Sequence, residues 1–305
     1  MKPFIRSLNI RERKGYVFSV CYSCFVFLHL FIVKFVSSKL HIGYLTLVTE
    51  SGALISLICF YRILMTLKKF GKTNTLEVKL IFHGGVFSFL AYSLIIASLY
   101  WSSITTTCLM LRMYPFIFLL SEYVMNDFEL THNEITAFVI SLITFIIIFL
   151  TSNDSRKTPG IILGILAIFF KVVATQYWKH SRGIVIDLLL LSVGFISSSV
   201  GGILLLFTSD KMEHLNFLGW VFIILNAFAT YYTRIFLLKV IKVVSNVDKI
   251  VILNFPLIIL AMPIDYFIFG EEFNWFYLSL ILIGANSIFF TQILFRRSQM
   301  NKGKS

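Results

Sequence analysis

Charged residues are scarce in this chain: they make up 14% of its 305 residues, whereas hydrophobic residues make up 58%. So few charges cannot cover a globular surface, which excludes a water-soluble protein and makes lipid the expected solvent. Acidic residues are fewer than basic residues, 15 against 27. The basic residues lie mainly in short connections between apolar runs, where they act as topology signals, so no nucleic-acid partner is expected.

Several functional motifs are missing as well. The sequence has no Gly-x-x-x-x-Gly-Lys-Ser/Thr loop, which disfavours ATP-driven pumping. Its four cysteines all lie in apolar runs, and Cys21 and Cys24 are interpreted as packing residues. No cleavable signal peptide is evident, because a basic head leads directly into a full-length apolar run. The six histidines show no metal-ligand spacing, and His83 alone is considered as a proton carrier.

The apolar runs have the length of membrane-spanning helices. A span needs about 20 apolar residues to cross a hydrocarbon core of about 30 Å. Ten runs meet this requirement, so the expected fold is an all-α integral membrane protein with ten transmembrane helices. The predicted spans are 16–38, 41–64, 78–100, 103–125, 135–152, 160–178, 184–208, 215–240, 247–270 and 273–295.

The distribution of basic residues predicts the orientation. With the N-terminus in the cytoplasm, the inner connections and termini hold 19 Lys and Arg residues and the outer connections hold 4. This asymmetry places both termini in the cytoplasm. Five spans per half then give two inverted repeats. The predicted units are 1–152, with the basic head, 153–295, and a basic cytoplasmic tail at 296–305.

Two stretches of the sequence, 103–150 and 245–291, follow the same plan. Each begins with an apolar run that holds a proline, continues with a short acidic break, and ends with a second apolar run. The prolines are Pro115 and Pro256, and the breaks are Asn126-Asp127-Phe128-Glu129 and Gly270-Glu271-Glu272-Phe273. An internal duplication of this kind is typical of membrane carriers.

These motifs resemble the drug/metabolite transporter superfamily, specifically its EamA-type permeases. The resemblance is carried by Ser103-Ile104-Thr105-Thr106, Tyr114-Pro115-Phe116 and Asn126-Asp127-Phe128-Glu129, with Val244-Ser245-Asn246, Phe255-Pro256-Leu257 and Phe269-Gly270-Glu271-Glu272 as the echo. The echo is closer to the family, because the first copy has Asn-Asp where the family has Gly-Glu. The resemblance implies secondary transport by alternating access. It leaves the substrate open, since members carry amino acids, drugs, nucleotide sugars or phosphate esters.

Charged residues inside the spans are candidates for function, because burying a charge in lipid is costly. Depth along the predicted spans matches Lys34 with Asp265 near the outer boundary, and Asp187 with Arg234 near the inner boundary. Salt bridges at these two levels would form and break as gates. In the alternative interpretation, each side chain reaches its own interface.

The middle of the membrane holds an unequal set of charges: Glu50, Arg112 and Lys171. Glu50 can neutralise one of the two cations, and the other would bind an anionic substrate group. We expect Arg112 to be the anchor, Lys171 the second contact, and Glu50 the partner of a cation or a proton site. Tyr114, Tyr231 and Asn254 are expected to add hydrogen bonds or stacking. Alternatively, Glu50 and Arg112 form a structural bridge and Lys171 faces outward.

Prolines and small residues predict where the helices bend and touch. Pro115 and Pro256 would push their spans off axis, either as parts of a gate or as static kinks. Gly194, Ser198 and Gly202 recur every four residues and predict a close helix contact.

The expected function is secondary transport of a small anionic or zwitterionic metabolite, without catalytic residues, a cofactor or a metal. The alternatives are a nucleotide-sugar or phosphate-ester antiporter of an organelle, a membrane-embedded enzyme, and a channel or scaffold. The expected partners are the substrate and the bilayer, for a monomer or homodimer. Short loops favour a bacterial inner membrane over a Golgi or endoplasmic reticulum membrane.

Overall fold

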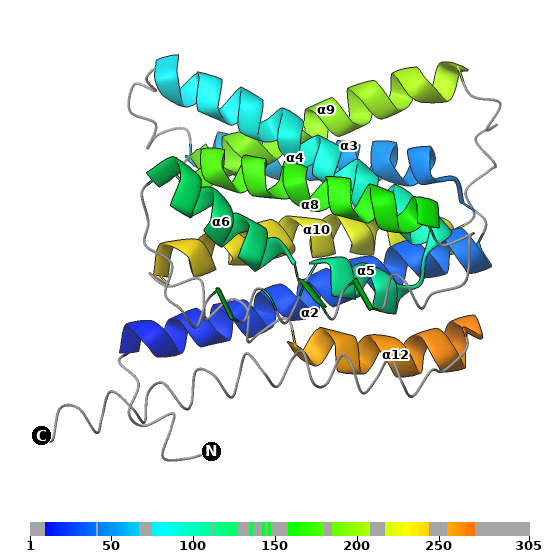
Figure 1. The fold of residues 1–305 in the computed structure, drawn as a ribbon. Coiled ribbons are helices and arrows are strands. Elements are labelled where there is room, and N and C mark those ends of the chain that lie inside the picture. The colour runs from blue at the N-terminus through cyan, green and yellow to red at the C-terminus, as the bar shows by residue number, and fades with distance from the viewer. Residues whose placement is uncertain are drawn as a thin grey trace, which may run out of the picture.

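A computed structural model shows a bundle of packed α-helices (Figure 1). It describes residues 10–40, 42–66, 75–111, 113–126, 135–136, 139, 142–143, 146–147, 158–179, 185–207, 217–243 and 255–271. Throughout these residues the regular secondary structure is helical, as the sequence predicts.

Six helices of the described part are long and apolar enough to cross a membrane. They are α2 (Ile10–Lys39), α3 (Tyr44–Thr66), α4 (Thr75–Trp101), α8 (Thr158–Lys179), α9 (Val185–Phe207) and α10 (Phe217–Val243). The predicted bounds of these spans agree within a few residues, except that α2 begins at Ile10 instead of residue 16. The multi-pass membrane character is therefore confirmed. Most of the predicted span 135–152, and all of the span 273–295, lie outside the described residues.

The predicted span 103–125 is wrong in one respect, because it is two helices: α5 (Ile104–Leu111) and α6 (Tyr114–Asn126). Pro115 explains the break. Its nitrogen has no hydrogen to donate to the carbonyl of Leu111, and its ring would clash with that carbonyl in a continuous helix. The Met113 N–H instead donates to the Met110 carbonyl at 2.8 Å, which makes a tighter turn between α5 and α6.

The second predicted proline helix is described from residue 255 onwards, as α12 (Phe255–Phe269). Pro115 is the second residue of α6, where a missing N–H costs no helical hydrogen bond, and Pro256 is the second described residue of α12. Pro263 stands inside α12. Gly270, just after α12, has a φ of 69°, a left-handed conformation that favours glycine at the end of a helix.

Three helix pairs form the most extensive contacts of the bundle: α4 with α8, α3 with α9, and α2 with α10. In Figure 1, α12 lies beside α2 at one side of the bundle, and α4 and α9 lie at the other. The interior between the pairs is filled by apolar side chains such as Leu30, Leu99 and Ile168, each at most 1% exposed.

The contact between α3 and α9 depends on glycine. A Cβ atom built on Gly194 would lie 2.7 Å from the Gly52 carbonyl oxygen and 2.8 Å from the Ser56 nitrogen. One built on Gly52 would lie 3.0 Å from the Gly194 oxygen. The predicted close contact at Gly194 is therefore confirmed. Gly202 is looser, because its Cβ would find only the Thr49 Cγ2 atom, at 4.0 Å.

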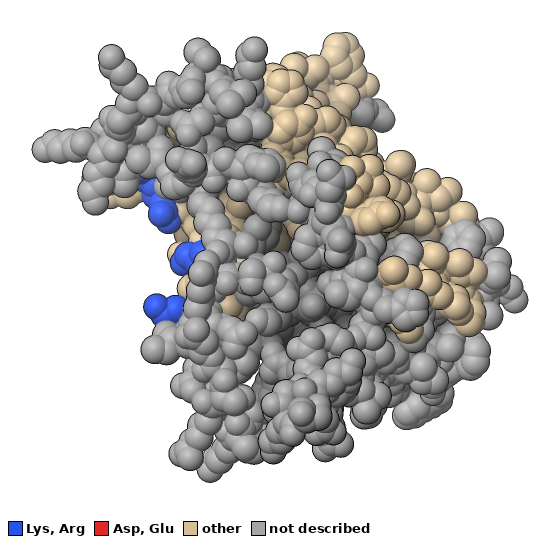
Figure 2. Space-filling model, turned by 60° about the vertical axis from the view of Figure 1, so that its left-hand side comes forward, with Lys and Arg blue, Asp and Glu red and all other residues tan. Residues whose placement is uncertain are grey.

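The outer surface of the bundle is apolar, as a lipid-facing surface requires. Large side chains such as Phe207, Phe217 and Phe267 are at least 80% exposed. On the face shown in Figure 2, the described atoms are almost all uncharged, with basic atoms gathered near one edge. Hydrophobic residues thus fill both the interior and the exterior, which leaves the few buried polar groups as candidates for function.

Candidate functional site

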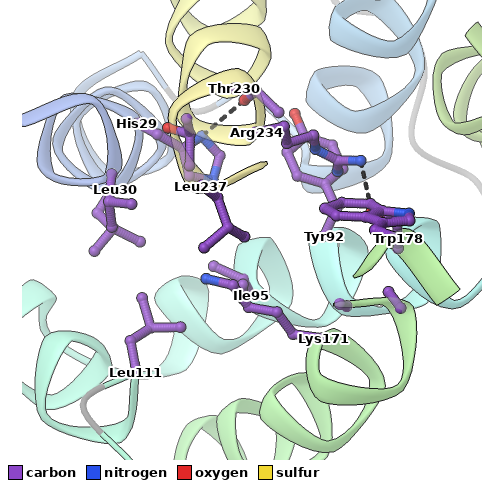
Figure 3. A pocket seen from close by; sticks show the side chains of 15 residues that line it. His29, Leu30, Tyr92, Ile95, Leu111, Lys171, Trp178, Thr230, Arg234 and Leu237 are labelled. Carbon is purple, nitrogen blue, oxygen red and sulfur yellow. Dashed lines mark hydrogen bonds between the residues drawn. The ribbon is translucent and has the colours of Figure 1, made fainter. Parts of the chain in front are cut away.

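A cavity lies inside the bundle, where α2, α4, α5, α8 and α10 meet (Figure 3). Its volume is about 60 Å³, whereas a single buried water needs roughly 10–15 Å³. The cavity therefore has room for a few waters or for one small polar group. Most of its wall is apolar, and its polar side chains include His29, Tyr92, Lys171, Thr230, Thr233 and Arg234.

Arg234 on α10 is a buried residue of the cavity wall, with 7% of its surface exposed. Its guanidinium donates to the Ser88 hydroxyl at 2.5 Å. The guanidinium carbon lies 5.6 Å from the ring centre of Tyr92 and 5.9 Å from that of Trp178. Aromatic faces carry partial negative charge, so these two rings partly compensate a cation that has left water.

Lys171 on α8 approaches the cavity from another side. Its Nζ atom donates to the Tyr22 hydroxyl at 2.9 Å and lies 4.9 Å from the ring centre of Tyr114. The Tyr114 hydroxyl and the Thr175 hydroxyl form a 2.7 Å hydrogen bond. Of the predicted substrate contacts, Lys171 thus lines the cavity, and Tyr114 lies directly behind it.

A buried hydrogen-bond network closes the cavity on the α2 side. His29 Nδ1 lies 2.7 Å from Asn226 Oδ1 and 3.2 Å from Thr230 Oγ1. Asn226 donates its amide hydrogens to Ser51 at 2.9 Å and to the Tyr92 hydroxyl at 3.1 Å. Asn226 therefore ties four helices together: α2, α3, α4 and α10.

The charged side chains of the described cavity wall have one sign. Lys171 and Arg234 are basic, and no Asp or Glu occurs among the described residues that line it. The Thr233 hydroxyl, also in the wall, is buried and has no hydrogen-bond partner in the described part of the chain. The chemistry of these groups would suit an anionic group that can accept hydrogen bonds. Within the described ranges, no group of three or more His, Cys, Asp or Glu side chains is arranged to hold a metal.

The cavity wall repeats itself along the sequence. Several lining residues form pairs whose members are separated by the same number of positions as His29 and Lys171, a separation that we call the repeat offset. The pairs are His29 with Lys171, Ser88 with Thr230, Ala91 with Thr233, Tyr92 with Arg234, and Ile95 with Leu237. Gly52 and Gly194, which meet at the crossing of α3 and α9, are also one repeat offset apart. In the cavity wall, the repeat offset thus relates residues of α2 to residues of α8 and residues of α4 to residues of α10.

Two of the predicted site residues lie elsewhere. Glu50 on α3 is half-buried and is not among the residues that line the cavity. Tyr231 packs in a separate apolar cluster with Ile55 and Cys59, and the Arg62 guanidinium lies 5.6 Å from its ring centre. Arg112 and Asn254, and the side chain of Asp187, are outside the described part of the structure.

The predicted outer pair, Lys34 and Asp265, binds the turn between α4 and α5. Lys34 Nζ donates to the carbonyls of Leu99 and Ser102, at 3.2 and 2.8 Å, at the end of α4. The Asp265 carboxylate accepts the N–H groups of Ile104 and Thr105, at 3.2 and 2.7 Å, at the start of α5. It also accepts the Thr105 hydroxyl at 2.6 Å. Each charge thus complements the dipole of a helix end.

Sequence reasoning missed His29 and Asn226, and it predicted Arg234 in another place, as half of an inner gate with Asp187. His29 was one of six histidines without a motif, Asn226 was one polar residue in a long apolar run, and Arg234 was expected near the inner boundary. The signal that could have identified His29 and Arg234 is the repeat offset, since it aligns His29 with Lys171 and Tyr92 with Arg234.

Comparison with known proteins bears on the fold alone. No protein-family model and no curated protein matches the chain. Among solved structures, 27 chains match. One of them, described only as the crystal structure of a protein, has a TM-score of 0.59 and 11% sequence identity, over 88% of this chain and 97% of that chain. At this identity the match shows a shared fold that spans nearly the whole chain.

Proposed function

We propose that this protein is a secondary transporter of the drug/metabolite transporter type, similar to EamA permeases, and that it moves a small metabolite with an anionic group by alternating access. One observation carries the proposal: a cavity inside a bundle of membrane helices, lined by two basic side chains, the half-buried Lys171 and the buried Arg234. Buried cations are costly in lipid, and a carrier recovers that cost when an anion binds.

The helix packing supports two repeats of five spans. The repeat offset relates α2 to α8 and α4 to α10. The contact between α4 and α8 therefore corresponds to the contact between α10 and α2. The repeat offset also relates α3 to α9, so the contact between these two helices corresponds to itself. Gly52 and Gly194 meet at this contact. This is the pattern expected around a pseudo-two-fold axis. With five spans per repeat, the two repeats have opposite directions across the membrane.

The cavity narrows the class of cargo. An arginine and a lysine suit the oxygen atoms of a carboxylate or phosphate. The cavity volume of about 60 Å³ favours a small carboxylate or phosphate ester over a whole nucleotide sugar. An organelle phosphate-ester antiporter therefore remains the second candidate, since the same two cations would bind its cargo. Transport needs a larger opening at one end of the bundle, which alternating access provides.

Counterflow in proteoliposomes tests the proposal. The purified full chain is reconstituted, loaded with one unlabelled compound, and offered labelled carboxylates, phosphate, phosphate esters and neutral sugars in turn. A carrier shows saturable counterflow of at least one anion and none of the sugars. Flux that rises linearly with concentration would indicate a channel instead, and the absence of flux with every anion would overturn the proposal.

A further inference from the structure

His29 holds a special position in the cavity wall. It is the equivalent of Lys171 under the repeat offset, so the two corresponding sites carry a lysine on α8 and a histidine on α2. Histidine is the side chain whose charge changes most readily near neutral pH. His29 is 7% exposed, so a proton that reaches it must come through the cavity.

The hydrogen bonds of His29 determine which nitrogen is available. Asn226 uses its amide hydrogens for Ser51 and Tyr92, so its Oδ1 atom accepts from His29 Nδ1–H at 2.7 Å. The proton of the neutral ring is then on Nδ1, and the lone pair is on Nε2. Among the described residues, nothing donates to Nε2. His29 is therefore held in place through one nitrogen while the other can take up a proton.

The charges around His29 make its protonation depend on an anion. Lys171 from α8, Arg234 from α10 and Tyr92 from α4 all line the same cavity, and the ring centres of His29 and Tyr92 are 5.5 Å apart. A third positive charge beside Lys171 and Arg234 is repelled when the cavity is empty. A bound anion removes that repulsion, and a protonated His29 in turn strengthens anion binding, because such coupling is reciprocal.

We propose that His29 carries the proton in a proton–anion symport. The proton binds to Nε2 from the side on which the cavity is open, the anion binds between Lys171 and Arg234, and both leave on the other side. An N–H bond forms at Nε2 as an O–H bond of a hydronium ion breaks on the open side, and the reverse exchange releases the proton to water on the other side. This inference rests on the proposed transport function and adds the ion to which transport is coupled.

The other histidine considered in the sequence, His83 on α4, does not have these properties. It is exposed, and its ring lies against Phe82 and Tyr177, with ring centres 6.0 and 5.9 Å apart. It is not part of the cavity wall. His83 is therefore the matched control for substitutions of His29.

The experiment uses proteoliposomes of the full chain with a pH-sensitive dye inside. An anion found to show counterflow is added outside, and its uptake is followed together with the internal pH. Wild-type protein is expected to acidify the interior during uptake, and an outside pH one unit lower should raise uptake severalfold. His29→Gln should lose both effects at whatever rate of anion counterflow it retains, whereas His83→Gln should behave as wild type.

The outcomes separate this inference from the transport function. Wild-type uptake of an anion without acidification overturns the role of His29, and so does His29→Gln that still accumulates the anion in response to a pH gradient. If His29→Gln does not fold, His29→Asn is measured in its place, and the wild-type measurement still decides whether transport is coupled to protons. If no anion shows counterflow at all, the transport function itself fails.

Discussion

The cavity and the turn between α4 and α5 both contain charged side chains surrounded by apolar helices, yet the charges have different partners. At the turn, Lys34 binds the carbonyl end of α4 and Asp265 binds the amide end of α5. In the cavity, Lys171 and Arg234 lie against aromatic rings and hydroxyl groups.

We expect this difference to separate charges that stabilise the fold from charges that bind cargo. A charge at a helix end satisfies backbone groups that would otherwise lack partners, so the contact is complete in the folded chain. Ring faces and hydroxyls compensate a cation only in part, so positive potential remains in the cavity for a ligand. We therefore expect substitutions at the turn to change stability and substitutions in the cavity to change transport.

The largest effect is expected for the cavity cations. Arg234→Gln and Lys171→Gln should each lower the efficiency of anion counterflow by about 10- to 100-fold, because hydrogen bonds to charged groups contribute ~1.5–3 kcal/mol. Initial rates in proteoliposomes measure this. The control is Lys239→Gln, since Lys239 is exposed on α10 and lies over the rings of Phe18 and Phe236. Wild-type rates in Arg234→Gln would remove the distinction between the two regions.

The crossing of α3 and α9 provides a second structural reference. Gly194→Ala should lower the free energy of unfolding by ~1–3 kcal/mol, because the new methyl group would meet the backbone of α3. Gly202→Ala, on the same helix with open space around it, should stay within about 0.5 kcal/mol of wild type. Thermal unfolding in detergent gives both values. Equal stability of the two variants would show that the crossing is not tight.

At the turn, Asp265→Asn keeps the size of the side chain and removes its charge. It should cost ~1–2 kcal/mol of stability, because three hydrogen bonds at the start of α5 lose their charged acceptor. The concentration of anion that half-saturates counterflow should not change. A shift of that concentration comparable to the one in Arg234→Gln would mean that the turn takes part in cargo binding.

The smallest effect is expected for Lys34→Met, at about 0.5–1 kcal/mol of stability, because Lys34 is only partly buried. Combining it with Asp265→Asn tests the gate that the sequence suggested. If the two residues only hold the same turn, the double variant shows coupling in unfolding and none in transport. Coupled transport defects at unchanged stability would support the gate instead.

Individual residues show how much of the fold and of the candidate site could be predicted from the sequence. Hydropathy identified six helices that the structure confirms, and the cost of burying charge identified Lys171 and Arg234 as important. Depth along a helix could not predict that these two share a cavity, because it leaves the rotation of each helix unknown. For the same reason Glu50, at a similar predicted depth, was expected beside Lys171 and lies outside the cavity wall.

The sequence by itself determined the solvent and the class of fold, since a chain with 58% hydrophobic residues can only bury them in lipid and in its own helices. The tertiary structure alone decided which polar residues meet. His29 and Asn226 are 197 positions apart and bond because α2 packs against α10. Such contacts depend on which faces of the helices pack together. At the crossing of α3 and α9, for example, Gly52 and Gly194 allow close packing, but only the folded chain brings these two glycines together.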